Sequence, residues 1–233
     1  MPNQTPSLFH VHMPKTGGTS VHGAFNRAAG CSSRVGGGHD PASLHREAFG
    51  QRLVLGTLRN PWQWYRSLYE HIQNNNEQQR SQLSEWGGGS LRFRDVVYGW
   101  TGHRHGYRPR PGVIWEPVDG SAPAAGEGLW SWAVRYFYGS PWLVDVLLDT
   151  SQLDAGLRLL GVEPVERKNT REHRGAGRFV AMTSRDDEAG LWDADMLGWV
   201  QEGDGELAAT LGYVLPLQGR IGGPVYECRR LAA

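Results

Sequence analysis

Cysteine is scarce in this chain of 233 residues, which holds only Cys31 and Cys228, near its opposite ends. Such a pair provides neither a disulfide framework nor the spacing of a metal site, so we expect a reducing compartment and a site without a metal. A chain of this length can bury a sufficient core without covalent cross-links. We therefore expect a single domain over residues 1–233.

Net charge and long apolar runs are missing as well. The 24 basic and 24 acidic residues balance, which indicates neither a nucleic acid nor an anionic membrane as a partner. No apolar run reaches the length of about eighteen residues that a membrane span requires, and the first residues, MPNQTPSLFHVHMPK, lack the pattern of a secretion signal. We expect a cytoplasmic protein with no transmembrane segment, in which any anion site is local.

Two strand–loop–helix units are predicted in the first third of the chain. The strands are residues 7–13 (SLFHVHM) and 52–58 (RLVLGTL), because both are short and mostly apolar. The helices that follow them are residues 19–30 and 60–73, whose apolar residues recur at helical spacing. The residues that can cap these helices are Thr19 or Ser20 for the first, and Asn60, followed by Pro61, for the second.

The same alternation resumes later in the chain. The later elements are a helix at 129–139, a strand at 141–149, a helix at 151–161, a helix through EAGLWDADMLGWVQEG that Ser184 can cap, and a short helix in GELAATLGYVL. Residues 74–128 have little periodicity, and we interpret them as an insertion or lid. The pattern predicts an α/β domain, a P-loop-like parallel sheet flanked by helices with a loop-rich insertion in the middle, which binds ligands beyond the carboxyl ends of its strands.

The segment HMPKTGGTS, residues 12–20, joins the first strand to its helix and is similar to a phosphate-binding loop. Its lysine precedes the glycines, whereas the Walker A pattern G-x-x-x-x-G-K-[ST] has lysine near its end. Free N–H groups at a glycine turn and a helix N-terminus suit a phosphate or sulfate. An ordinary tight turn is the alternative. The groups available to an anion are the Lys15 ammonium, the hydroxyls of Thr16, Thr19 and Ser20, and the unhindered backbone of Gly17 and Gly18.

A second anion site is predicted at the end of the second strand. Arg59 ends that strand, and Ser67 lies eight residues later, two turns along the next helix. An arginine and a hydroxyl can hold a phosphate through charge-assisted hydrogen bonds. Two sites on neighbouring strands predict a ligand with two anionic ends. The alternatives are a surface ion pair for Arg59 and helix packing for Ser67.

Two segments, FHVHMPKTGGTSV (9–21) and TLRNPWQWYRSLYEH (57–71), together resemble the signature segments of the sulfotransferase superfamily, particularly the Golgi-type carbohydrate sulfotransferases and their bacterial relatives. The resemblance implies 3′-phosphoadenosine-5′-phosphosulfate (PAPS) as co-substrate and a hydroxyl of a carbohydrate or small natural product as acceptor. It assigns the 5′-phosphosulfate to Lys15, Thr16, Gly17, Gly18, Thr19 and Ser20, and the 3′-phosphate to Arg59 and Ser67.

The C-terminal third is similar to the same family. RKNTREHRGAGRF resembles a basic loop that closes over the nucleotide, and LWDADMLGWVQEGDGELAATLGYVL resembles the helical segment after it. The chain departs from the family at Trp64, where members often have a second arginine, and Arg66 can compensate. The nucleotide contacts that the resemblance implies in the basic loop are Lys168, Asn169, Thr170 and Arg174.

Sulfuryl transfer needs an aligned nucleophile and leaving group, stabilisation of the leaving-group charge, and a base for the hydroxyl proton. Lys15 would stabilise the leaving phosphate. His39, in GGGHDPASL, is our first candidate for the base, because relatives have a histidine in a comparable segment and its pKa suits neutral pH. Asp40 either orients His39 or only begins a turn, and an exposed loop histidine is the alternative for His39.

The other histidines are weaker candidates. His10 and His12 lie on the first strand, where hydrogen-bonded core histidines are more common, and His71 could also face the site. His103 and His105 have no third ligand nearby, so we do not interpret them as a metal site.

Two other functions are open from the sequence. A P-loop kinase or nucleotide hydrolase would keep the fold, but G-K-[ST] and a plain apolar strand ending in aspartate are missing. A non-catalytic module would use the anion sites to bind sulfated glycans without affinity for PAPS.

Overall fold

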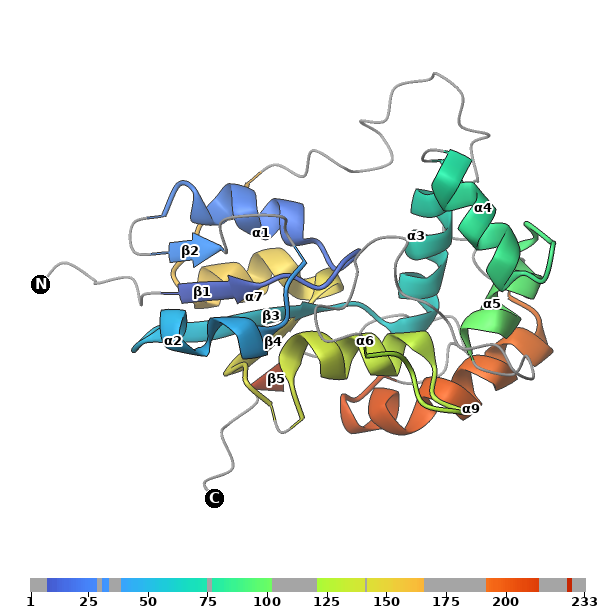
Figure 1. Cartoon of the computed structure of the whole chain (residues 1–233). Helices are drawn as coiled ribbons and strands as arrows, with labels where there is room; N and C mark the ends of the chain where they lie inside the picture. Colours follow the sequence, from blue (N-terminus) through green and yellow to red (C-terminus); the bar gives the residue numbers. More distant parts are fainter. Residues whose placement is uncertain are drawn as a thin grey trace, which may run out of the picture.

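The computed structural model describes residues 8–28, 31–33, 39–74, 77–101, 121–140, 142–165, 192–213 and 226–227. Its strands form one sheet in the order β2-β1-β3-β4-β5 (Figure 1). The four parallel strands are β1 (Leu8–Val11), β2 (Cys31–Ser33), β3 (Leu53–Leu58) and β4 (Val146–Asp149), and β5 (Tyr226–Glu227) pairs antiparallel with β4. The prediction of an α/β domain with a parallel sheet flanked by helices is confirmed.

The helices fall into those that cover the sheet and those that form a helical half beside it (Figure 1). The helices that cover the sheet are α1 (Gly18–Phe25), α2 (Arg46–Phe49), α6 (Leu129–Tyr138) and α7 (Leu153–Leu159), with the 3₁₀ turns η1 (Ala42–His45) and η2 (Thr150–Gln152). Those of the helical half are α3 (Pro61–Gln73), α4 (Glu77–Trp86), α5 (Phe93–Trp100) and α9 (Ala194–Thr210).

The two faces of the sheet bury different sets of side chains, because successive residues of a strand point to opposite faces. Leu8, Leu55 and Leu148 pack with apolar residues of α1 and α7. Phe9 and Val54, each next to one of these leucines in its strand, belong to the larger core that includes α3, α6 and α9. The sheet is thus covered on both faces, and its carboxyl edge is where loops leave for α1 and α3.

Helix α3 follows the predicted pattern closely. It begins at Pro61, and the Asn60 side chain caps it by accepting a hydrogen bond from the Trp62 N–H at 3.0 Å. The apolar residues that recur at helical spacing along α3 are buried, as that spacing predicts, and they are Tyr65, Leu68, Tyr69 and Ile72.

Residues 74–128 are not loop-rich throughout, which corrects our expectation for the first part of this segment. Residues 77–86 and 93–100 form α4 and α5, and both helices contribute to the main core. Trp86 and Trp100 are buried and meet edge to face, with ring centroids 5.4 Å apart. The helical periodicity of this part of the sequence is weak, because α4 is largely polar and α5 spans only eight residues.

The C-terminal helical region also differs from the prediction. A single helix, α9, spans the two that were expected, and it begins at Ala194, where the Asp193 side chain accepts a hydrogen bond from the Met196 N–H at 2.9 Å. Gly203 is accommodated inside α9 because a Cβ there would lie 3.1 Å from the Gly128 Cα. A side chain at position 203 would crowd the Gly128 backbone, so glycine fits there although it weakens a helix. The predicted cap Ser184 lies outside the described residues.

Two smaller boundaries are corrected. Helix α1 is capped by Gly17, in a left-handed conformation with φ 83°, rather than by Thr19 or Ser20, and ends at Phe25. Strand β4 begins only at Val146. Just before it, Asp145 bonds to Val54 through both its backbone N–H and its carboxylate, each at 2.8 Å.

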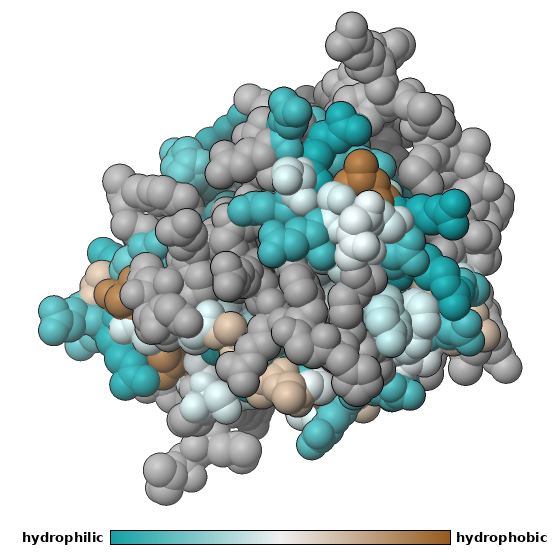
Figure 2. All heavy atoms as spheres, turned by 45° about the vertical axis from the view of Figure 1, so that its right-hand side comes forward, coloured by the Kyte–Doolittle hydropathy of each residue, from teal (hydrophilic) through white to brown (hydrophobic). Residues whose placement is uncertain are grey.

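No helix among the described residues is both long and apolar enough to cross a membrane. On the face shown in Figure 2, hydrophilic residues predominate and hydrophobic ones occur singly. Isolated exposed apolar residues are normal for a protein surface.

A buried carboxylate joins α9 to α3 and α6. Asp204 is 1% exposed and accepts hydrogen bonds from the Tyr65 hydroxyl at 2.7 Å and the Ser131 N–H at 2.8 Å. Burial raises the pKa of Asp204 from its ordinary 3.8 to about 6. The folded protein therefore holds this proton more tightly than the unfolded chain, so the contribution to stability is present below the ordinary pKa and is lost as the pH rises through about 6.

We expect the stability of Asp204→Asn relative to the wild type to rise by about 2 kcal/mol between about pH 4 and about pH 7, because the variant has no carboxylate to ionise in the core. Urea denaturation at both pH values measures this difference. Glu206→Gln, which changes an exposed carboxylate on the same helix, is the control. Equal stability differences for Asp204→Asn at the two pH values would contradict the prediction.

Candidate anion-binding site

The loop between β1 and α1 has an unusual backbone. Lys15 has φ 66° and Gly17 has φ 83°, both in the left-handed region. That conformation is uncommon for a lysine, and turns of this kind are typical of backbone concavities that bind anions. The N–H groups of Gly17, Gly18 and Thr19 make no hydrogen bond to any other described residue. The loop therefore presents donors at the N-terminus of α1, where the helix dipole also favours an anion.

Thr16 lies beneath this loop rather than on its surface. It is fully buried, and its hydroxyl donates to the Met13 carbonyl at 2.7 Å and lies 2.8 Å from the Thr57 hydroxyl of β3. In this arrangement the Thr16 side chain holds the loop to the sheet, and only its backbone can face an anion. Thr19 is exposed and Ser20 is half-buried, so their hydroxyls remain near the surface.

The tryptophan that departs from the family pattern fixes the other side of the loop. Trp64 is fully buried, and its indole N–H donates to the Pro14 carbonyl at 2.8 Å. Arg66, the expected substitute for the missing arginine, is 4% exposed, and its Nε donates to Glu70 at 3.0 Å. Position 64 therefore supports the loop from α3 instead of supplying a charge.

We expect Trp64→Phe to destabilise the protein by about 1–3 kcal/mol and to weaken anion binding, because the buried Pro14 carbonyl loses its donor. Trp100→Phe is the matched control, since Trp100 is equally buried but its indole nitrogen makes no hydrogen bond to a described residue. Urea denaturation and titration with adenosine-3′,5′-bisphosphate give the two readouts. Equal effects of the two substitutions on binding would contradict this role of Trp64.

Arg59 lies at the same edge of the sheet as the loop. β1 and β3 are neighbouring parallel strands, with Val11 opposite Gly56, so both chains leave the sheet at this edge. The Arg59 carbonyl accepts a hydrogen bond from the Trp130 indole at 3.0 Å, which fixes the turn into α3. Ser67 is on the partly exposed side of α3. The loop and Arg59 thus follow the ends of adjacent strands.

His39 lies beside the anion loop. Its ring centroid is 4.8 Å from that of His12, which follows β1 directly. Burial lowers the pKa of His39, and the positive charge of Lys15 lowers it further, while Asp40 acts in the opposite direction. His12 itself packs against Gly18 of the loop, so His39 is separated from the loop by a single ring. The Asp40 carboxylate lies 3.5 Å from the Nε2 of His45.

The remaining histidines divide between core and surface. His10 is buried, with its Nε2 3.4 Å from the Thr57 hydroxyl, so its interpretation as a core residue is confirmed. His12 does more than the sequence suggested, because it contacts His39. His71 is half-buried on α3. The predicted residues that lie outside the described part of the chain are His103, His105, Lys168, Asn169, Thr170 and Arg174.

Strand β4 ends in an aspartate, as the strand predicted at 141–149 does. Asp149 is 6% exposed and closes β4. Its carboxylate accepts hydrogen bonds from the Ser151 N–H at 2.7 Å and the Tyr213 hydroxyl at 2.5 Å. β3 lies between β4 and the strand that leads into the anion loop. The carboxylate therefore organises the turn into η2.

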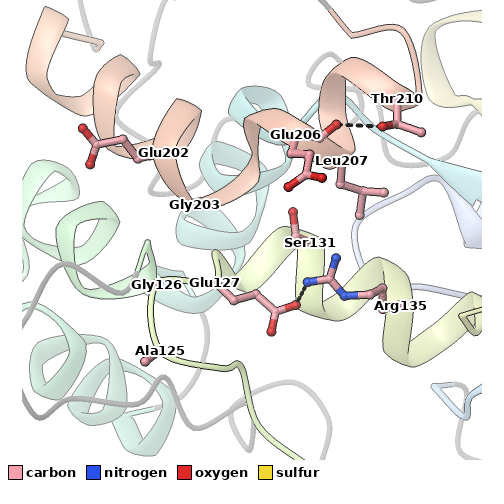
Figure 3. A pocket seen from close by; sticks show the side chains of 10 residues that line it. All are labelled: Ala125, Gly126, Glu127, Ser131, Arg135, Glu202, Gly203, Glu206, Leu207 and Thr210. Atoms are coloured by element: carbon pink, nitrogen blue, oxygen red, sulfur yellow. Dashed lines mark hydrogen bonds and ion pairs between the residues drawn. The ribbon is translucent and has the colours of Figure 1, made fainter.

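A separate cavity of about 350 Å³ lies between α6 and α9 (Figure 3). Two exposed glutamates of α9, Glu202 and Glu206, line it, and Glu127 at its other side is paired with Arg135. This mainly acidic lining would repel a phosphate or sulfate. The cavity is therefore a poorer candidate for an anion than the loop at the carboxyl edge of the sheet.

Among the described residues, no group of three or more histidine, cysteine, aspartate or glutamate side chains is arranged to hold a metal ion. No family model, curated protein or solved structure matches this chain. Its function must therefore be inferred from the site itself.

Proposed function

We propose that this protein is a PAPS-dependent sulfotransferase with a P-loop-like fold, which moves the sulfuryl group to a hydroxyl of a carbohydrate or small natural product. The observation that carries the proposal is the placement of His39 against His12, which packs on the loop that contains Lys15, at the sheet edge where the neighbouring strand β3 leads into Arg59. Two anion sites and a neutral base in one region are what transfer from a two-ended sulfate donor requires.

The donor's two anionic ends would be bound by different elements. The 5′-phosphosulfate would accept hydrogen bonds from the backbone N–H groups between Gly17 and Thr19, with Lys15 supplying the positive charge. The 3′-phosphate would bind to Arg59, and Ser67 on α3 would add a hydroxyl. The spacing between these elements is set by the pairing of β1 with β3.

In the reaction, the acceptor oxygen would attack sulfur and form a new S–O bond while the S–O bond to the 5′-phosphate breaks. A ring nitrogen of His39 would take the hydroxyl proton. Because burial and Lys15 both lower the pKa of His39, its ring is neutral and able to accept a proton near pH 7. Lys15 would stabilise the negative charge that develops on the leaving phosphate oxygen.

A P-loop kinase or nucleotide hydrolase is the second candidate, favoured by the aspartate at the end of β4. Two features weigh against it. The Asp149 carboxylate already accepts three hydrogen bonds within the protein, two from Ser151 and one from Tyr213, and Lys15 precedes the glycines of the loop instead of following them. A sulfated-glycan-binding module could use the same anion loop, but it would not need a base beside Lys15.

Isothermal titration with adenosine-3′,5′-bisphosphate, adenosine-5′-phosphate and ATP, without added magnesium, tests the proposal. We expect the bisphosphate to bind at least about tenfold more tightly than adenosine-5′-phosphate, because Arg59 meets a phosphate that only the bisphosphate has. Binding of ATP alone would favour the kinase. Binding of a sulfated oligosaccharide but of no nucleotide would favour the glycan-binding module.

A further inference from the structure

The ring of His12 fills the space between the anion loop and the candidate base. A Cβ at Gly18 would lie 2.0 Å from Cδ2 and 2.1 Å from Nε2 of His12, so the imidazole lies directly against the first turn of α1. On its other side, its centroid is 4.8 Å from that of His39, and the two planes are tilted by 51°. One side chain thus contacts both parts of the proposed catalytic site.

The His12 ring also packs against the buried side chain of His10, which is itself in contact with α1. His10 stacks on it, with centroids 5.7 Å apart and planes 27° apart, and Phe25 of α1 meets His10 edge on at 6.0 Å. Burial lowers the pKa of His10 well below its usual range, so His10 remains neutral beneath His12. The His12 ring therefore rests on a buried, uncharged layer and cannot move further into the core without disturbing it.

We propose that His12 is a positioning residue, whose ring sets the distance between the anion loop and His39 in the sulfuryl-transfer reaction. This inference rests on the proposed function of the site. A catalytic group displaced by about 1 Å can lose about 100-fold in rate, so a rigid spacer at this point affects turnover without touching the substrate. The glycine at position 18 is explained by the same contact, because any side chain there would push the ring toward His39.

The roles of ring shape and ring chemistry can be separated with two variants. His12→Ala removes the spacer, and His12→Phe keeps an aromatic ring but removes both nitrogens. His22→Ala is the control, because His22 is an exposed histidine of the same helix, α1, whose ring nitrogen lies 3.1 Å from the Asn26 amide. For each protein we would measure affinity for adenosine-3′,5′-bisphosphate by titration, and release of this product from PAPS, with water or an added alcohol as acceptor, over a range of pH.

We expect all variants to bind the bisphosphate within about threefold of the wild type. Turnover of His12→Ala should fall about tenfold or more. Turnover of His12→Phe should stay within about threefold of the wild type, and the fall of its rate at acid pH should be unchanged. Wild-type turnover in His12→Ala would overturn the proposal. So would equal losses in both variants with a lost acid limb, since His12 would then take the proton itself. Failure of the wild type to bind the bisphosphate would remove the proposed function and this inference together.

A second route keeps the test decisive if His12→Ala is poorly folded. Gly18→Ala places a methyl group where the ring lies and should displace it, so turnover should fall by about tenfold. In a His12→Phe background the clash persists, whereas in a His12→Asn background the shorter side chain leaves room for the methyl and the added loss should be small. Losses from Gly18→Ala that are independent of the residue at position 12 would overturn the proposal.

Discussion

Replacing His39 by alanine is expected to reduce release of adenosine-3′,5′-bisphosphate from PAPS by about 100-fold or more, while affinity for that product stays within about threefold. His39 is half-buried beside the loop and close enough to Lys15 for that charge to lower its pKa, whereas the phosphate-binding groups are on other residues. Loss of the base should therefore affect the rate and not nucleotide binding. Initial rates at saturating PAPS, together with calorimetric titration, separate the two quantities.

The pH dependence gives an independent readout of the same group. Because burial and Lys15 lower the pKa of His39, the ring stays neutral to a lower pH than an exposed histidine. The wild-type rate should fall on the acid side with a pKa below the ordinary 6.5, and this limb should be absent from the residual activity of His39→Ala. His71→Ala is the informative comparison. If it removes the acid limb and His39→Ala does not, the base is His71.

The elements that flank the proposed site were predictable because their signals are local. The Asn60–Pro61 pair specifies the start of α3 through side-chain capping and a fixed φ angle, and both features need no partner outside the helix. The apolar strands β1 and β3, and the glycine turn between β1 and α1, are likewise set by short segments of sequence. A site at the carboxyl edge of a parallel sheet follows from these elements alone.

The errors arose where tertiary packing decides the outcome. Helix α9 continues through Gly203, where the backbone of Gly128 packs closely against it. The sequence of α9 does not predict that contact. Helix α4 has a largely polar sequence, and only its burial of Leu83 and Trp86 against the core explains why it forms.

Around the loop, too, local sequence signals were predictable and tertiary contacts were not. The pattern P-K-T-G-G-T-S indicated which residues gather at the anion site, but not that the Thr16 hydroxyl turns inward to Met13 and Thr57. His12 was one of the weaker candidates from the sequence, and nothing in its pattern indicated its place between the loop and His39. Its contacts join residues far apart in the sequence, Gly18 on one side and His39 on the other, and spacing along the chain carries no information about such a meeting.

Arg59→Ala is expected to lower affinity for adenosine-3′,5′-bisphosphate by about tenfold to 100-fold and to leave affinity for adenosine-5′-phosphate unchanged, because a lost charge-assisted hydrogen bond costs about 1.5–3 kcal/mol. Lys15→Ala should weaken both ligands, since both carry a 5′-phosphate. Calorimetric titration of the two ligands against each variant therefore maps each end of the site to a residue.

The control for this comparison lies at the opposite end of the same strand. Arg52 precedes β3, is exposed, and donates to the Ala48 carbonyl at 3.1 Å, so Arg52→Ala removes an equal charge far from the carboxyl edge. If Arg59→Ala lowered affinity for both nucleotides equally, its role would be general attraction of anions or support of the loop. Support through the backbone is unaffected by the substitution, because the Trp130 indole bonds to the Arg59 carbonyl and not to its side chain. A loss confined to the bisphosphate therefore identifies a contact between the guanidinium and the 3′-phosphate, the feature that distinguishes a PAPS site from a site for ordinary nucleotides.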